Sequence, residues 1–151
     1  MNYKFRGKEI DSGEWVYGSY LWYFDHRYII PLGEELWRLS GPLSSIQEIG
    51  SYVLEVDPAT VGMFTGLLDK NGKEIYEGSQ LSFTVFDHND MDTQHVGQVY
   101  WDEKDLAWNI QSKSEVFSLG YILRQDDEVE VIGDIHDNPE LAGGKDAQRH
   151  T

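Results

Sequence analysis

The chain has 151 residues, no cysteine, a net charge of −15, and 40% hydrophobic and 13% aromatic residues. This length predicts one domain, or one domain with a small subdomain, and is sufficient to enclose a core. The lack of cysteine excludes disulfides, thiolate metal sites and a cysteine nucleophile. No run approaches the roughly 18 apolar residues that span a bilayer, and the N-terminus lacks the apolar segment of a secretory signal. We therefore expect a cytoplasmic protein with no membrane association.

The acidic residues are concentrated toward the C-terminal part of the chain. Residues 87–137 hold thirteen acidic side chains against three basic ones, a net charge of −10. Such a field repels the phosphates of DNA and RNA, so direct nucleic-acid binding is disfavoured. A solubilising surface is the simplest explanation of the charge. The alternative is an acidic face for a basic partner, such as a protein that normally holds DNA.

Short strands separated by turn residues are predicted along the N-terminal third of the chain. The expected strands are residues 3–7, 15–24, 27–30 and 52–56. The second and third of these form an aromatic hairpin with its tip at Asp25–His26. Pro58 then favours a turn before the next segment, because proline fixes the φ angle that the second turn position needs.

The stretch 60–79 is the most informative part of the sequence. Apolar residues lead into and out of Asn71–Gly72, a pair that accepts positive φ at both positions and so favours a type I′ hairpin turn. A second turn is expected at Glu77–Gly78. This stretch therefore predicts a β-hairpin with one apolar face, and it contains no catalytic constellation.

The remaining chain predicts four more strands, one short helix and a tail. The strands are expected at residues 80–86, 96–101, 107–110 and 129–135, with a short buried helix within 114–123. The expected fold is mainly β with minor α, a compact barrel-like or sandwich-like domain of short antiparallel strands with one or two short helices. We assign residues 1–137 to one domain, with any subdomain boundary near residues 50–60, and residues 138–151 to a flexible C-terminal tail.

Three sequence blocks together resemble the YopX family, whose members occur mainly in bacteriophages and prophages. The blocks are K-F-R-G with G-E-W-V-Y-G-S-Y at 4–7 and 13–20, T-V-G-M-F-T-G-L with D-K-N-G-K-E-I-Y-E-G at 60–67 and 69–78, and V-I-G-D-I-H-D-N-P-E-L at 131–141. The resemblance implies a mostly β, compact fold with a barrel-like part, a phage or prophage origin and action inside the bacterial cell. It implies no particular biochemical activity.

One position departs from the family pattern. The pattern continues Glu-Gly-Asp after the Ile-Tyr pair, and this chain has Ser79 in place of the acid. If the acid were catalytic in the family, this chain would be inactive. A serine hydroxyl can cap a turn as a carboxylate does, so we expect Ser79 to hold a turn.

Exposed aromatic side chains are the first candidate for a binding site, because Trp and Tyr are frequent anchors of protein interfaces. The candidate residues are Trp15, Tyr17, Trp22, Trp101 and Trp108. The alternative is that these rings cover a sheet face or a barrel interior, since aromatic residues dominate cores.

Two polar clusters are candidates for chemistry. Imidazoles and carboxylates that lie within eight residues could share a divalent cation, and the alternative is a solvated loop. These residues are His88, Asp90, Asp92 and His95. The second cluster is Asp134, His136 and Asp137, where a histidine beside carboxylates could act as a general base, or a turn could end the last strand.

The sequence leaves three functional hypotheses open. The first is a non-enzymatic phage accessory protein with an acidic surface that binds a host or phage protein, basic in charge, or that assembles with itself through uncovered edge strands. The second is a metal-dependent hydrolase that uses the His/Asp cluster, and the third is an acidic DNA mimic that occupies a host DNA-binding protein. No cofactor is expected apart from a divalent metal under the second hypothesis.

Overall fold

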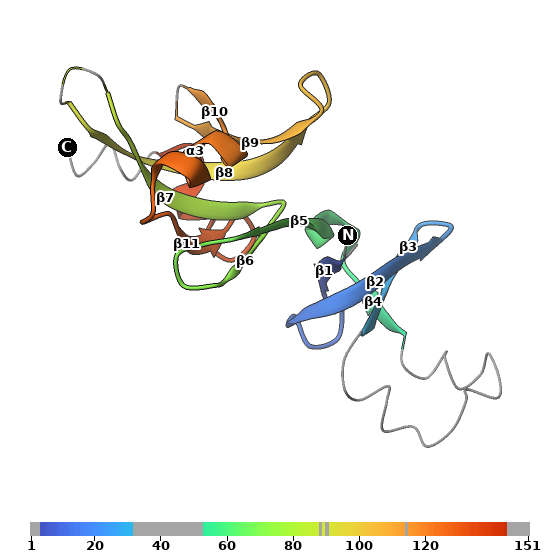
Figure 1. The fold of residues 1–151 in the computed structure, drawn as a ribbon. Helices are drawn as coiled ribbons and strands as arrows, with labels where there is room; N and C mark the ends of the chain where they lie inside the picture. The colour runs from blue at the N-terminus through green and yellow to red at the C-terminus, as the bar shows by residue number, and fades with distance from the viewer. Residues whose placement is uncertain (1–3, 32–52, 88, 90, 114, 145–151) are drawn as a thin grey trace. The chain divides into compact units, whose positions relative to one another are not determined.

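A computed structural model describes residues 4–31, 53–87, 89, 91–113 and 115–144. This part of the chain is mainly β, with two antiparallel sheets and one short α-helix, which confirms the predicted fold class (Figure 1). Within the described residues neither sheet closes into a barrel, so the sandwich-like form of the prediction fits and the barrel-like form does not. The chain divides into two compact units, residues 1–64 and 65–151.

The first unit is an antiparallel sheet in the order β4-β3-β2-β1. Its elements are β1 (Phe5–Lys8), β2 (Trp15–Tyr23), β3 (His26–Pro31), β4 (Leu54–Val56) and the 3-10 helix η1 (Pro58–Thr60). Ile29 and Val56 are fully buried on one face of this sheet. Gly7 lies against Val56, and a Cβ at this glycine would be 3.0 Å from the Val56 side chain. The unit therefore packs a small core that requires glycine at this crossing.

The turn between β2 and β3 lies one residue earlier than the sequence predicts. Tyr23 pairs with His26, so Phe24 and Asp25 form the turn, and the predicted tip at Asp25–His26 is wrong. Arg27 Nη1 donates to the Phe24 carbonyl oxygen at 2.9 Å. Turn rules miss this register because they reserve a left-handed position for glycine, asparagine or aspartate, and Phe24 occupies it with φ 51°.

Strand β5 (Gly62–Leu68) begins beside β1, and β6 (Glu74–Tyr76) is its neighbour further along. The turn that joins β5 to β6 is not the predicted type I′ turn, because only Gly72 has a positive φ, 77°. The Asp69 carboxylate accepts hydrogen bonds from the N–H groups of Asn71 and Lys73, at 2.8 and 2.9 Å. These bonds favour a longer turn that ends with a left-handed glycine.

The second unit contains a five-stranded sheet in the order β10-β9-β8-β7-β11. Its strands are β7 (Ser79–Val85), β8 (Thr93–Asp102), β9 (Ala107–Ser112), β10 (Val116–Ser118) and β11 (Glu130–Asp134). The segment 114–123, expected as a helix, supplies β10 and then the start of α3 (Leu119–Gln125), which Ser118 caps by accepting the Tyr121 N–H.

The C-terminal part of the second unit differs in one respect from the expected tail. The 3-10 helix η2 (Pro139–Gly144) lies in the segment that the sequence assigns to a tail, and it packs close to β8 and β9. Residues 145–151 lie outside the described part of the chain.

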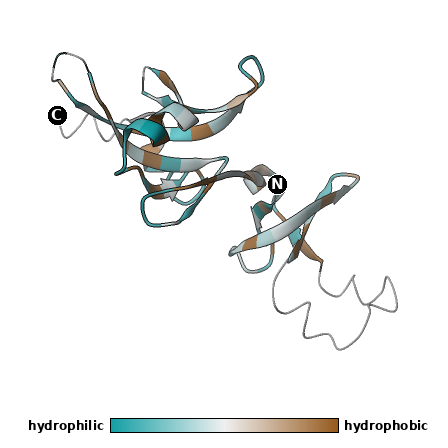
Figure 2. Ribbon diagram, viewed as in Figure 1, coloured by the Kyte–Doolittle hydropathy of each residue, from teal (hydrophilic) through white to brown (hydrophobic). Residues whose placement is uncertain are grey.

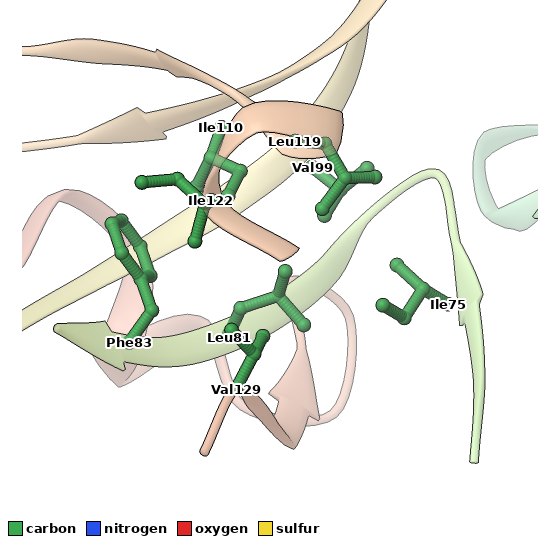
Figure 3. Packing of buried hydrophobic residues seen from close by; sticks show 8 residues of the cluster. All are labelled: Ile75, Leu81, Phe83, Val99, Ile110, Leu119, Ile122 and Val129. Carbon is green, nitrogen blue, oxygen red and sulfur yellow. The ribbon is translucent and has the colours of Figure 1, made fainter. Parts of the chain in front are cut away.

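The core of the second unit lies between one face of its sheet, helix α3 and β6 (Figure 3). The buried side chains are Ile75, Leu81, Phe83, Val99, Ile110, Leu119, Ile122 and Val129. Hydrophobic and hydrophilic residues alternate along β7, as expected for a strand with one buried face (Figure 2). Each large side chain of this cluster contributes about 1.5–3 kcal/mol through removal of apolar area from water.

Candidate functional site

Three consecutive aromatic residues are exposed at the tip of the β2–β3 hairpin. Trp22, Tyr23 and Phe24 have exposed fractions of 66%, 65% and 78%. We call these three residues the aromatic tip. Among the described residues, no further strand pairs beside the last rung of this hairpin, Tyr23 with His26. Tyr23 and Phe24 therefore lie beyond the rungs that β1 and β4 extend, whereas Trp22 lies on the last rung that β4 extends, through Arg27 and Val56. The β2–β3 hairpin is visible in Figure 1.

Ring contacts fix the orientation of the aromatic tip. The ring centroids of Phe5 and Tyr20 are 5.1 Å apart, and those of Tyr20 and Trp22 are 5.9 Å apart and stacked. Tyr23 and Phe24 meet edge to face at 4.5 Å. Aromatic pairs at such distances are attractive beyond their buried area. The tip is therefore preorganised by its own contacts.

Side chains on the neighbouring strands also hold the β2–β3 turn. His26 Nδ1 lies 2.5 Å from Glu55 Oε1 on β4. Arg27 contacts two carbonyl oxygens of the turn, those of Phe24 and His26. A two-residue turn with these additional contacts presents its side chains in a defined geometry.

Phe24 is held in an unfavourable backbone conformation. Its φ of 51° lies in the left-handed region, which costs about 1–2 kcal/mol for a residue with a Cβ. Glycine or asparagine would adopt this conformation more easily. A large apolar side chain that is mostly in solvent does not repay this cost through burial, and strained residues of this kind are concentrated at recognition sites.

Two predicted aromatic residues lie on the face of β2 opposite Trp22. Trp15 and Tyr17 differ from Trp22 by an odd number of positions and from Tyr23 by an even number, so they share the face of Tyr23 but lie further from the turn. The Arg6 guanidinium lies over the Trp15 ring at 4.2 Å from its centroid, and Lys8 Nζ lies at 5.4 Å. These cation–π contacts make Trp15 part of a packed strand surface rather than of the aromatic tip.

The other predicted aromatic residues belong to the second unit. Trp101 on β8 and Trp108 on β9 are cross-strand partners whose rings meet edge to face at 5.2 Å. Trp101 is exposed, whereas Trp108 packs partly against the core. The five predicted aromatic residues thus belong to separate surfaces. The residues singled out from the sequence do not include Tyr23, Phe24 and Leu106, which are exposed at hairpin ends and which a turn prediction with the correct register would have identified.

The predicted metal ligands are placed only in part. His88 and Asp90 lie outside the described residues, and Asp92 is exposed before β8. The His95 ring stacks on Phe83 at 5.5 Å, and its Nε2 lies 2.8 Å from Thr93 Oγ1. Among the residues that the structure describes, no three His, Asp or Glu side chains gather in a way that could hold a metal ion. The loop 88–95 stays a prediction as a metal site.

The second polar cluster is brought together by a turn after β11. Asp134 is buried, and its Oδ1 accepts the backbone N–H groups of His136 and Asp137, each at 2.8 Å. The Asn138 side chain accepts the Asp134 N–H at 3.3 Å. This arrangement matches the turn that the sequence offered as the alternative to a general base. A catalytic role for the cluster stays a prediction.

Asp69 lies in the 60–79 block and is hydrogen-bonded to the last strand, β11. Its Oδ2 accepts the Val131 N–H at 2.9 Å, and the Lys70 N–H donates to the Val129 carbonyl oxygen at 2.9 Å. Lys70 Nζ also lies near Glu128 and Glu130, at 3.3 and 3.5 Å. The β5–β6 turn therefore covers the outer edge of β11, which would otherwise present unpaired backbone groups.

The Asp69 carboxylate is stabilised in its charged form. Burial alone would raise the pKa of Asp69, but three backbone N–H donors and the nearby Lys73 charge outweigh burial and lower the pKa below its ordinary value. Asp69 is thus a structural residue that holds the β5–β6 turn against β11.

Ser79 also has a structural role. Its fully buried hydroxyl accepts the Tyr76 N–H at 3.0 Å across the turn at Glu77–Gly78. This bond confirms the expectation that Ser79 holds a turn.

Comparison with known proteins identifies the family of the chain. No helix in the described residues has the length and apolar character to cross a membrane. A search of curated proteins finds no match. The crystal structure of protein EF1440 from Enterococcus faecalis is similar in fold, with a TM-score of 0.51 and 22% identity over 93% of this chain and 98% of that chain. The family described as "YopX protein" matches residues 4–142, nearly the whole sequence, and the chain belongs to the YopX family.

Proposed function

We propose that this chain is a non-enzymatic protein-binding module that contacts its partner through the aromatic tip, Trp22, Tyr23 and Phe24. The observation that carries the proposal is the exposure of all three rings on a preorganised turn. Trp and Tyr are enriched among residues that dominate binding energy, and rigid anchors lose little conformational entropy on binding.

The size of the aromatic tip suits the centre of an interface. An aromatic side chain buries about 150–250 Å², so three side chains that are 65–78% exposed supply roughly 300–500 Å². A standard interface buries about 800 Å² on each partner. The tip would therefore provide the hydrophobic centre, and nearby polar residues such as Asp25 and Arg27 would provide the rim.

The charge of the chain favours a basic partner. A net charge of −15 attracts basic proteins at long range and repels nucleic acids and anionic membranes. Membership of the YopX family supports a phage or prophage origin, with action on a host or phage protein in the bacterial cytoplasm. No observation of comparable weight favours a DNA mimic, or a hydrolase, for which the described residues form no metal cluster.

The proposal can be tested by affinity capture from phage-infected cells with the full-length chain. We expect the wild-type chain to retain a partner that the double variant Trp22→Ser/Tyr23→Ser does not retain. The control is Ile10→Ser/Tyr121→Ser, which removes exposed apolar side chains away from the tip and should keep the partner. Retention of the same proteins by both double variants would overturn the proposal.

Self-assembly is tested in the same series by sedimentation of the purified chains. A wild-type dimer that the tip substitutions dissociate would identify a second copy as the occupant of the aromatic tip. A monomer at all concentrations, with a partner captured, is the result we expect.

A further inference from the structure

The end of the β8–β9 hairpin carries a second exposed apolar surface. Trp101 and Leu106 have exposed fractions of 43% and 73%, and Trp101 meets Trp108 edge to face. We call Trp101, Leu106 and Trp108 the β8–β9 patch. It belongs to the second unit, whereas the aromatic tip belongs to the first unit. The two surfaces can therefore be tested separately.

Leu106 repeats the backbone feature of Phe24. It is the last residue of the loop between the paired residues Asp102 and Ala107, and its φ is also 51°. This is a left-handed position at which glycine or asparagine is the usual residue. A mostly exposed leucine gains little from burial there, so the requirements of the fold do not account for the side chain.

The turn that carries Leu106 is held in place by its own polar groups. Asp102 Oδ1 accepts the N–H groups of Lys104 and Asp105, at 2.9 and 3.2 Å. The buried Asn109 amide donates to carboxylate oxygens of Asp102 and Asp105, at 3.2 and 3.0 Å. The loop is thus preorganised in the absence of any partner.

The negative charge at this end of the hairpin favours a positively charged ligand. Three carboxylates and one lysine lie in the four residues 102–105, and Glu103 and Asp105 are exposed beside Leu106. An anionic lipid surface or nucleic acid would be repelled by these groups. A segment that combines apolar side chains with lysine or arginine would place its apolar residues on the patch and its cations against the carboxylates.

We propose that the β8–β9 patch binds a cationic amphipathic segment of a protein. Trp101 and Leu106 supply the apolar contact, and Glu103 and Asp105 supply the charge complementarity. The proposal does not depend on the aromatic tip. If both surfaces bind, one chain can hold two segments at once. Where the two segments belong to one partner, binding of the first raises the effective concentration of the second and so increases the overall affinity.

The test uses the full-length chain and a synthetic lysine–leucine peptide of fourteen residues, measured by fluorescence anisotropy of a label on the peptide. We expect Leu106→Asn and Trp101→Ser each to weaken binding about tenfold, which is typical for loss of an apolar anchor. Glu103→Gln should weaken binding by a smaller factor, about twofold, and reduce its dependence on salt. A glutamate–leucine peptide of the same length should not bind.

The control variants are Ile10→Ser, which removes an exposed apolar side chain from the first unit, and Tyr121→Ser, which removes an exposed ring from α3. Both should bind the peptide within about twofold of wild type, because a change outside a contact is normally near neutral. Thermal unfolding should show that every variant is folded. Equal binding by all variants would mean that the peptide binds the net charge alone, and no binding at millimolar peptide would mean that the patch has no such ligand; either result overturns the proposal.

A second measurement locates the bound peptide. Backbone amide shifts in a ¹⁵N NMR titration should change mainly within 101–108. Changes confined to other segments would also overturn the proposal, even if the affinity were high.

Discussion

The two units of this chain differ in how they use their large apolar side chains. Within the described residues, the second unit encloses an eight-residue cluster in which each side chain is at most 1% exposed. Among its described residues, the first unit has only Ile29 and Val56 buried to this degree, and it exposes the aromatic tip. Aromatic content alone therefore does not indicate how large a core a unit of this chain encloses. Both units expose some large apolar side chains, such as Trp101 and Leu106 in the second, but among the described residues the second unit encloses the larger core.

The two units also differ in net charge. Residues 1–64 hold nine acidic and five basic side chains, and residues 65–151 hold eighteen and seven. The net charges are therefore −4 and −11. We expect the second unit to produce most of the long-range attraction toward a basic partner, and the aromatic tip of the first unit to supply short-range contact.

The largest expected difference between the units comes from removing one aromatic ring from each. Phe83→Ala should lower the free energy of unfolding by about 3–5 kcal/mol, because it removes a buried ring and leaves a cavity. Trp22→Ala should change it by less than about 1 kcal/mol, since that ring is mostly in solvent. Urea unfolding of both variants, followed by far-UV circular dichroism, checks this. Similar losses would mean that the aromatic tip is part of the core.

The next effect concerns Asp69, which anchors the β5–β6 turn to β11. Asp69→Asn should lower the free energy of unfolding by about 2 kcal/mol. The amide NH₂ replaces one carboxylate oxygen, so a backbone N–H that this oxygen accepted is left without an acceptor. Hydrogen exchange of the Val131 amide should accelerate most. The matched control is Asp92→Asn, an exposed carboxylate, which should change stability by less than about 0.5 kcal/mol. If both variants cost the same, Asp69 is not an anchor.

The same residue gives an expected pH dependence. The pKa of Asp69 is lowered in the folded state from 3.8, so its contribution is complete at pH values above the unfolded pKa and is lost as the pH falls through the folded pKa. The wild-type chain should lose stability more steeply than Asp69→Asn below about pH 4. Thermal unfolding between pH 2 and 7 measures the difference. Parallel curves for the two chains would contradict this assignment.

A smaller effect is expected at Ser79, where a hydroxyl holds a buried turn. Ser79→Ala should lower the free energy of unfolding by about 1–2 kcal/mol, because the buried Tyr76 N–H loses its acceptor and water does not replace it. Ser12 makes a similar bond to the Glu14 N–H, at 3.2 Å, in an exposed turn of the first unit. Ser12→Ala should therefore cost only a few tenths of a kcal/mol, since water replaces the bond. Equal costs at the two serines would remove this contrast between the units.

The smallest effect on stability is expected at Phe24. Phe24→Asn should leave the free energy of unfolding unchanged or raise it by up to about 1 kcal/mol, because asparagine adopts the left-handed conformation more easily. Thermal unfolding of the purified variant gives the sign. A clear loss of stability would show that Phe24 serves the fold rather than recognition.

Features that depend on neighbouring residues could be predicted from the sequence. The alternation in β7 identified a strand with one buried face, and Asn71–Gly72 located the β5–β6 turn although not its type. The pattern around Ser79 also identified a turn-holding hydroxyl correctly. These features are local, so the sequence alone determines them.

Features set by distant residues could not be predicted. Asp69 reaches a backbone N–H 62 positions further along the chain, and His95 stacks between strands that are separated in sequence. In the aromatic tip, Trp22 was among the predicted residues, whereas Phe24 was not singled out, for a different reason. Turn rules describe the least strained residue for each position, and Phe24 and Leu106 both contradict those rules.

The central claim is that the aromatic tip binds a protein, and it is tested most directly by titration of the purified partner against the wild-type and Phe24→Asn chains. We predict that the dissociation constant rises at least about tenfold in the variant while its unfolding temperature stays the same or rises. Equal affinity for the two folded chains would contradict the claim.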